Sequence, residues 1–324
     1  MNPNERNHIM LTRRLNKGTK IYIAGCGGML GEAVYRVFSG LGVVKATDID
    51  VNEPWLEYAD VRDYHGIEES IKRFMPDLII NLAAKTDMEE CEREQENAWL
   101  TNALGAENIA LLSEKLGVPY IYISTAGIFD GEQEFFNDFD VPNPLSIYAK
   151  SKYAGEVFTK QHVRKHYIVR PGWMMGGGPR KDKKFVNKIY NQIVNGAKQL
   201  NVVDDKFGTP TFTHDFARGL LKLAESDLYG VYNQVCGGSC SRFDVAVEFV
   251  RLLGLAEKVK INKVPSDFFQ REYFASRPRS EKLVNMKLNA RGLNVMRDWK
   301  TCLQEYSKEF VDDLNRSIAD ELKG

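Results

Sequence analysis

The fold of this chain is decided by the stretch Lys20-Ile21-Tyr22-Ile23-Ala24-Gly25-Cys26-Gly27-Gly28-Met29-Leu30-Gly31. Its first five residues have the apolar character of a buried strand, and the apolar spacing from Leu30 to Phe38 indicates a helix. Between them, glycines permit a tight turn and a close approach of backbone to ligand, while the helix N-terminus offers free N–H groups to an anion. We therefore expect a dinucleotide pyrophosphate to lie against Gly25, Gly28, Met29, Leu30 and Gly31.

An acidic residue ends the next strand-like run, where a ribose ligand is expected. Residues 43–47 read as that second strand, and Asp48 stands 23 residues after the first glycine of the turn. A carboxylate there accepts hydrogen bonds from the adenosine ribose and repels a 2′-phosphate, which favours NAD(H). Lys45 is near enough in sequence to soften that preference, so NADP(H) stays open. After a third strand-like run, Asp60 and Val61 are candidates for contact with the adenine.

Three further strand-like runs alternate with helix-like segments. They cover residues 77–81, 119–123 and 167–170. Strands that alternate with helices are typical of parallel sheets. We therefore predict an α/β fold, a doubly wound parallel sheet of the Rossmann type, with a smaller C-terminal α+β substrate domain.

The pattern changes after Pro171-Gly172, which ends the last of these strands. Residues 174–184 are rich in glycine and basic residues, and we expect a flexible connection there. The predicted division gives 18–171 to a dinucleotide-binding domain, with 207–235 returning to it, and gives 172–206 and 236–324 to the substrate-binding region.

One helical face near the C-terminus is apolar at three- and four-residue spacings. Its members are Trp299, Leu303, Tyr306, Phe310, Leu314 and Ile318. We expect this helix to close the core of its own domain, with partner binding as the alternative.

Composition excludes several classes of protein. The 324 residues are 43% hydrophobic and 27% charged, as in a folded soluble protein. Lys+Arg and Asp+Glu both number 44, so no net charge attracts nucleic acid or an anionic membrane. The sequence contains neither a signal-peptide-like run nor an apolar run long enough to span a membrane. We expect a cytoplasmic protein without nucleic-acid or membrane partners, and a homodimer stays open.

The cysteines and histidines do not indicate a metal site. Five cysteines stand at positions 26, 91, 236, 240 and 302, an odd number that fits a reducing compartment. Cys236 and Cys240 have no second pair with which to complete tetrahedral zinc coordination, and His162 and His166 lack an obvious third ligand nearby. We therefore predict no metal.

Tyr148 and Lys152 stand four residues apart, so a helix would place a phenol and an ammonium on one face. A neighbouring cation lowers the pKa of a tyrosine, which can then exchange a proton with a reacting oxygen near neutral pH. Chance supplies about one such pair in a chain of this composition, so the surroundings must decide. Ser124-Thr125 ends the strand at 119–123, at the sheet edge where open α/β folds bind ligands. We expect these hydroxyl, phenol and ammonium groups to converge beside the dinucleotide.

These segments resemble a known family in order along the chain. A glycine turn, Asp-Val, Asn-x-Ala-Ala, Ser-Thr and Tyr-x-x-x-Lys are together similar to the pattern of extended short-chain dehydrogenase/reductases. The resemblance is strongest to the dTDP-4-dehydrorhamnose reductase family and runs from about residue 18 to residue 300. The motifs that carry it are Asn81-Leu82-Ala83-Ala84-Lys85-Thr86, Thr101-Asn102-Ala103-Leu104-Gly105, Ile123-Ser124-Thr125, Phe129-Asp130-Gly131, Tyr148-Ala149-Lys150-Ser151-Lys152-Tyr153-Ala154-Gly155-Glu156, Arg170-Pro171-Gly172-Trp173, Asp205-Lys206-Phe207-Gly208-Thr209-Pro210-Thr211 and Arg277-Pro278-Arg279-Ser280.

The resemblance implies an NAD(P)H-dependent reductase of a 4-keto nucleotide-sugar, which gives a deoxyhexose for polysaccharide synthesis. It implies that Tyr148 donates the proton, that Lys152 holds the nicotinamide ribose and lowers the pKa of the tyrosine, and that Thr125 hydrogen-bonds the substrate oxygen. It also places Ala83 and Ala84 beside the cofactor.

The remaining assignments concern the nucleotide-sugar. By the same resemblance, Trp173 lines the sugar pocket. Arg277 is a candidate for the diphosphate because a guanidinium matches phosphate oxygens. The other basic residues of the substrate region either bind the diphosphate together with Arg277 or form a solvated surface. They are Arg180, Lys181, Lys183, Lys184 and Arg279.

Ala126-Gly127 is the main departure from the family pattern. Family members usually carry Asp-Tyr there, so this pocket lacks two side chains. Nucleotide-sugar 4,6-dehydratases carry an acidic pair at the same place, which argues against a dehydratase. Two alternatives stay open: an epimerase of the same superfamily, and a non-catalytic regulatory subunit that keeps the cofactor fold.

Overall fold

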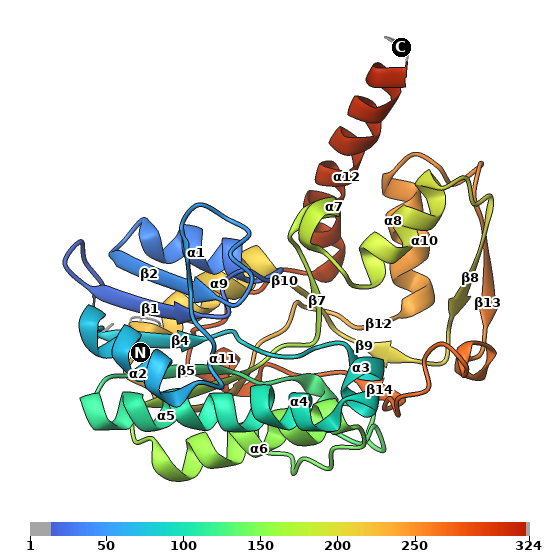
Figure 1. Ribbon diagram of the computed structural model, residues 1–324. Helices are drawn as coiled ribbons and strands as arrows, with labels where there is room; N and C mark the ends of the chain where they lie inside the picture. The colour runs from blue at the N-terminus through green and yellow to red at the C-terminus, as the bar shows by residue number, and fades with distance from the viewer. Residues whose placement is uncertain (1–13, 322–324) are drawn as a thin grey trace, which may run out of the picture.

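The computed structural model describes residues 14–321, with side chains through residue 315. Its central sheet has seven parallel strands in the order β11-β6-β5-β4-β1-β2-β3 (Figure 1). Their bounds are β1 Lys20–Ala24, β2 Val43–Asp48, β3 Leu56–Tyr58, β4 Leu78–Asn81, β5 Tyr120–Ile123, β6 His166–Arg170 and β11 Gly230–Asn233. The strand order reverses between β1 and β4, which is where such sheets bind their ligands. The predicted fold class is confirmed.

Alternation along the strands gives this sheet two apolar faces. Ile21 and Ile23 of β1 face one core, which is covered by α1 (Gly31–Ser39), α9 (Thr213–Ala224) and α11 (Met286–Ala290). Tyr22 and Ala24 face the opposite core, which is covered by α2 (Tyr64–Phe74), α5 (Gly105–Leu116) and α6 (Ile147–His162). Both faces of a parallel sheet are buried in this way, so its strands read as continuous apolar runs in the sequence.

A second apolar core belongs to the C-terminal half. It is built by β7 (Trp173–Met175), β8 (Gln199–Val203), β10 (Pro210–Phe212), α8 (Phe185–Val194), α10 (Arg242–Leu252) and α12 (Trp299–Glu321). Trp299, Leu303, Tyr306 and Phe310 of α12 are buried in it, and Leu314 packs against it. The helix therefore closes the core of its own region, and its far end projects away from the body (Figure 1). The side chain of Ile318 lies outside the described residues.

Shorter elements complete the chain. They are α3 (Met88–Arg93), α4 (Gln95–Trp99), α7 (Gly178–Lys181), β9 (Phe207–Gly208), β12 (Cys240–Ser241), β13 (Lys260–Val264), β14 (Ser280–Glu281), a π-helical segment η2 (Leu100–Leu104) and the 3₁₀ turns η3 (Ala126–Ile128) and η4 (Ser266–Phe269). β12, β9 and β14 form a small sheet, and β13 pairs with β8. No helix within residues 14–321 combines the length and apolar character needed to cross a bilayer.

The flexible connection predicted over residues 174–184 is wrong. β7 pairs in parallel with β10, and α7 follows it directly. The glycines that suggested flexibility meet a conformational need, because Gly176, Gly177 and Gly178 all have φ between 60° and 154°. At Gly176 an added Cβ would also lie 2.0 Å from the Thr213 hydroxyl oxygen. Residues 176–178 therefore form a specific turn between β7 and α7.

Packing refines the predicted division of the chain. β11 pairs with β6 in the main sheet and α9 packs on that sheet, whereas β9 and β10 pair outside it. Leu288 and Leu293 also pack into the sheet core. We propose that residues 18–171 and 213–235 form the dinucleotide-binding domain, with 286–293 packed against it.

Candidate active site

A cleft of about 1280 Å³ runs from the sheet's switch point to the second core. The predicted site residues that line it are Gly25, Gly28, Met29, Leu30, Asp48, Asp60, Val61, Ala83, Ala84, Thr125, Tyr148, Lys152, Trp173 and Arg277. Gly31 is the predicted residue that does not line the cleft. Segments far apart in the sequence therefore meet at one site, although their individual roles stay predictions.

The glycine turn is tight on one side and open on the other. Gly25 has a φ of 74°, and an added Cβ would lie 2.2 Å from the backbone nitrogen of Ala83. Gly31 is equally restricted, because its Cβ would lie 1.8 Å from the carbonyl oxygen of Cys26. Gly28 is exposed and lines the cleft, and a Cβ there would meet nothing within 4 Å. Because Leu30, the N-cap residue of α1, provides no side-chain hydrogen bond to the helix N-terminus, the turn fits a dinucleotide pyrophosphate.

Alanine at the two cleft-lining glycines should separate folding from binding. We expect Gly25→Ala to lower the free energy of unfolding by more than about 2 kcal/mol, because alanine is strained at positive φ and clashes with backbone. We expect Gly28→Ala to leave stability unchanged and to weaken dinucleotide binding about tenfold, because its methyl would occupy the ligand's space. Denaturant unfolding and cofactor titration measure the two effects. Equal loss of stability in both variants would contradict this reading of the turn.

The end of the cleft that is predicted to hold the adenosine is acidic. The Asp48 carboxylate accepts hydrogen bonds from the backbone N–H of Gly27 at 2.8 Å and of Asp50 at 3.0 Å, which fixes it at the end of β2. Asp60 is bound by Arg62, and the side-chain hydrogen bond from Arg62 is the main cause that lowers the pKa of Asp60. Lys45 pairs with Glu57 at 2.9 Å, so its charge is already engaged.

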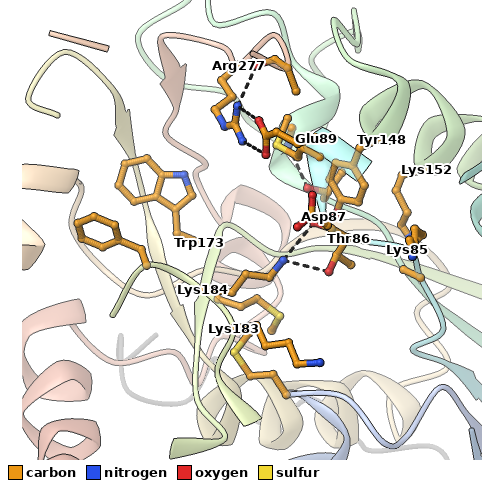
Figure 2. Close-up of a pocket in the computed structure, with 18 of the residues that line it drawn as sticks. Lys85, Thr86, Asp87, Glu89, Tyr148, Lys152, Trp173, Lys183, Lys184 and Arg277 are labelled. Carbon is orange, nitrogen blue, oxygen red and sulfur yellow. Dashed lines mark hydrogen bonds and ion pairs between the residues drawn. The ribbon is translucent and has the colours of Figure 1, made fainter. Parts of the chain in front are cut away.

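Thr125, Tyr148 and Lys152 meet between the dinucleotide turn and the second core. Thr125 follows β5 and caps η3, where its hydroxyl oxygen accepts a hydrogen bond from Gly127 N–H at 3.1 Å. The same hydroxyl lies within hydrogen-bonding reach of the Tyr148 phenol. Ser146 caps the N-terminus of α6, so Tyr148 lies in the first turn of that helix and Lys152 lies one turn later. Figure 2 shows the tyrosine and lysine side chains lying next to each other in the cleft.

The pKa of Tyr148 moves in the direction opposite to the prediction. Burial raises it to about 12, and the hydrogen bond with Thr125 only partly offsets that rise. The spacing of Tyr148 and Lys152 indicates a neighbouring cation, but it does not reveal the loss of solvent around the phenol, which acts in the opposite direction. The phenol is therefore protonated at neutral pH, which is the form a proton donor needs.

Lys152 is buried on the inner side of α6. Burial lowers its pKa to about 7, while Glu156 acts in the opposite direction. Its ammonium nitrogen lies 4.4 Å from the centre of the Tyr122 ring, a favourable cation–π contact. Glu156 in turn forms a buried ion pair with Arg170, which ties α6 to the end of β6. The helix that carries both predicted catalytic residues is thus fixed to the sheet.

Trp173 forms one wall of the inner cleft. Gly208 makes room for its indole, since a Cβ there would lie 2.3 Å from the ring. The Arg242 guanidinium lies 3.6 Å from the ring centre, and the indole N–H donates to Glu281 at 2.7 Å. Arg242 and Glu281 line the cleft but were not predicted. Glu281 directly follows the Arg277-Pro278-Arg279-Ser280 motif, a position that could have drawn attention to it, whereas no sequence spacing points to Arg242.

The basic residues proposed for the diphosphate differ in availability. The Arg277 guanidinium approaches Glu89 to 2.7 Å, and Lys184 donates to the Thr86 hydroxyl at 3.0 Å (Figure 2). Both contacts join the second region to the segment after β4. Lys183 lines the cleft and is exposed, so it can reach an anion directly. The other three point elsewhere: Arg180 and Lys181 pair with Glu53, and Arg279 is exposed outside the cleft lining.

Comparison with known proteins covers almost the whole chain. The family model described as RmlD substrate binding domain matches residues 19–311. The spore coat polysaccharide biosynthesis protein SpsK of Bacillus subtilis (strain 168) is 30% identical over 294 residues, which are 90% of this chain and 98% of that protein. The dTDP-4-dehydrorhamnose reductase of Escherichia coli (strain K12) is 28% identical over 299 residues, which are 89% of this chain and 97% of that enzyme.

Solved structures agree with these matches. A dTDP-4-dehydrorhamnose reductase of Clostridium acetobutylicum is 34% identical, with a TM-score of 0.82 over 92% of this chain and 100% of that chain. The dTDP-4-dehydrorhamnose reductase of Bacillus anthracis, in complex with NADP, is 28% identical, also with a TM-score of 0.82, over 90% and 99% of the two chains. The shared fold extends over both cores of the molecule.

Proposed function

Because the chain belongs to the RmlD substrate binding domain family, we propose that it is a nicotinamide-dependent reductase of a nucleotide-linked 4-keto-6-deoxyhexose. Relatives of similar identity over nearly the full length are named dTDP-4-dehydrorhamnose reductase and dTDP-4-keto-6-deoxy-D-glucose reductase. The match to SpsK, a spore coat polysaccharide biosynthesis protein, supports a role of the product in a surface polysaccharide. Its substrate and cofactor are soluble metabolites, so we propose that it acts in the cytoplasm.

One observation carries this proposal: Thr125, Tyr148 and Lys152 line the same cleft as the glycine turn. A regulatory subunit that only bound the dinucleotide would have no use for a buried proton donor beside it. Maintaining a lysine at 3% exposure costs stability, because burial disfavours its charged form. Such groups commonly mark catalytic sites.

The residues divide the chemistry as follows. A bound reduced nicotinamide supplies the hydride that adds to the ketone carbon. Thr125, whose hydroxyl lies within hydrogen-bonding reach of Tyr148, donates its O–H to the ketone oxygen and orients that oxygen toward Tyr148. Tyr148 protonates that oxygen as charge develops there, which general acid catalysis makes about 10²- to 10⁴-fold faster. Lys152 holds the ribose hydroxyls and, as a cation, stabilises the phenolate that Tyr148 leaves behind.

Lys183, Lys206 and Arg277 offer positive charge for the diphosphate. All three line the cleft, and Lys206 donates to the carbonyl oxygen of Arg277 at 2.9 Å. Because Arg277 already faces Glu89, a phosphate would have to compete with that carboxylate. We therefore propose that Lys183, which is exposed in the cleft, contributes more to diphosphate affinity than Arg277 does.

We further propose that NADH is preferred over NADPH. The fixed Asp48 carboxylate would repel a 2′-phosphate, and Lys45 cannot offset this while it pairs with Glu57. Asp48→Ser should therefore shift the ratio of kcat/KM for NADPH over NADH upward by about tenfold. Steady-state kinetics with both cofactors measure the ratio, and Glu69→Gln, an exposed change on α2 outside the cleft, is the control. A ratio that is unchanged in Asp48→Ser would remove Asp48 from cofactor selection.

The function is tested by following the oxidation of NADH and NADPH against a panel of nucleotide-linked 4-keto sugars. We expect one or more of them to be consumed in equal amounts with the cofactor. If the protein binds NADH but consumes it with no member of the panel, the reductase proposal fails.

A further inference from the structure

Glu281 occupies a central position in the inner cleft, and holding Trp173 uses only half of its carboxylate. It lies on β14, in register with Gly208 of β9. One oxygen, Oε2, accepts the Trp173 indole hydrogen bond at 2.7 Å. The other, Oε1, receives no hydrogen bond from any residue within the described range 14–321. This half-buried oxygen lines the cleft and is therefore available to a hydrogen-bond donor of a bound ligand.

Distances place this oxygen near the reacting group. A Cβ built on Gly127 would lie 3.5 Å from Thr125 Oγ1 and 3.6 Å from Glu281 Oε1. The two oxygens are therefore at most about 7 Å apart. That span accommodates two neighbouring oxygens of one sugar, each with a hydrogen bond of about 2.8 Å to the protein. Because Gly127 has no Cβ, it leaves this space open, and its neighbours Ala126 and Ile128 in η3 pack into a separate apolar cluster.

The charge around Glu281 favours a neutral hydrogen-bond donor. Arg242, stacked on Trp173, is near enough for Glu281 to act on its pKa, which burial nevertheless lowers to about 10. No ion pair joins Glu281 to Arg242 or to another cation within the described part of the chain. The carboxylate thus has a counter-charge nearby that does not occupy its free oxygen. A sugar hydroxyl can donate to that oxygen without adding charge to the site.

We propose that Glu281 Oε1 accepts a hydrogen bond from the C3 hydroxyl of the keto-sugar and thereby selects for it. This proposal rests on the proposed function, which places the C4 ketone at Thr125 and Tyr148. In a 4-keto-6-deoxyhexose, C3 carries the hydroxyl next to the ketone, whereas C5 carries a methyl group and the ring oxygen, neither of which can donate a hydrogen bond. Glu281 then fixes the ring so that the ketone oxygen faces the Tyr148 hydroxyl.

The test compares Glu281→Leu with wild type on three substrates. These are a nucleotide-linked 4-keto-6-deoxyhexose and its 3-deoxy and 2-deoxy analogues. For wild type, loss of the C3 hydroxyl should lower kcat/KM about 10- to 100-fold, because it leaves the carboxylate unpaired. On the full substrate, Glu281→Leu should have a kcat/KM lower than that of wild type by a similar factor. On the 3-deoxy analogue, the kcat/KM of Glu281→Leu should be close to that of wild type, because the contact with the C3 hydroxyl is already absent. On the 2-deoxy analogue, the loss caused by the substitution should match that on the full substrate.

A purely structural role for Glu281, holding Trp173, predicts another pattern. Glu281→Leu would then lower kcat/KM by the same factor on all three substrates, and this result would overturn the proposal. Glu281→Gln, which keeps an acceptor for the Trp173 indole, should show the same dependence on the C3 hydroxyl with a smaller loss, and it serves if the leucine variant does not fold. The assignment to the C3 hydroxyl would also be overturned if the effect of the substitution on kcat/KM disappeared on the 2-deoxy analogue instead of on the 3-deoxy analogue. Wild type that reduces none of the three sugars would contradict the proposed function instead.

Discussion

Tyr148→Phe is expected to lower kcat by about 10²- to 10⁴-fold while cofactor affinity changes little. The phenol is the proton donor placed at the ketone oxygen, and phenylalanine keeps the ring but removes the proton. Because burial raises the pKa of Tyr148 to about 12, the wild-type hydroxyl remains protonated through the neutral range. Single-turnover kinetics with saturating cofactor and substrate measure the loss in the chemical step.

Tyr153→Phe is a matched control on the same helix. Tyr153 packs beside a small apolar cluster that includes Phe129 and does not line the cleft. We expect this variant to retain wild-type kcat. A Tyr148→Phe variant with more than about a tenth of the wild-type kcat would exclude Tyr148 as the main proton donor.

Lys152→Met is expected to reduce activity strongly and, without ligand, to stabilise the protein. Activity should fall because the variant can neither bind the ribose hydroxyls as a cation nor stabilise the phenolate. Stability should rise because burial of the ammonium opposes folding, as the lowered pKa of about 7 indicates. Loss of the cation–π contact with Tyr122 offsets only part of that gain. Thermal unfolding of the ligand-free protein and steady-state kinetics measure the two effects.

The gain in stability should depend on pH in a defined direction. The unfolded chain binds a proton at Lys152 below its ordinary pKa of about 10.5, whereas the folded chain binds it only below about 7. Protonation of Lys152 therefore makes the free energy of unfolding of the wild type rise with pH between about 7 and about 10.5. Lys152→Met should exceed wild type most at or below pH 7, and the difference should vanish near pH 10.5.

Lys150→Met gives the control for this pH dependence. Lys150 is exposed on the same helix, so its replacement should leave both activity and the pH profile of stability unchanged. A Lys152→Met variant less stable than wild type at pH 7 would show that the buried ammonium contributes favourably to folding.

Elements set by local pattern could be predicted from the sequence. The run of apolar residues before Gly25 and the period of the helix after Leu30 depend on neighbours in the chain, and β1 and α1 form where expected. The same is true of Asp48 at the end of β2 and of Tyr148 in the first turn of α6. A parallel sheet then brings these strand ends to one edge, which is why so many predicted residues line one cleft.

Features that depend on long-range contacts could not be predicted. The pairing of Arg277 with Glu89 joins residues 188 positions apart, and the Trp173–Glu281 hydrogen bond joins residues 108 apart. The raised pKa of Tyr148 results from burial by several segments rather than from the residue four positions away. Glycines 176–178 resembled a flexible connection because their positive φ angles are visible only in three dimensions.

Transfer of deuterium to the sugar from NADH that carries deuterium at both C4 positions tests the reductase assignment most directly. With a nucleotide-linked 4-keto-6-deoxyhexose, we expect each product molecule to carry one deuterium at C4, each accompanied by one oxidised cofactor, as measured by mass spectrometry and NMR. An isomerised sugar without deuterium and with unchanged cofactor would indicate an epimerase. Either that result or unchanged substrate in the presence of bound cofactor would contradict the proposal that this protein reduces a keto-sugar.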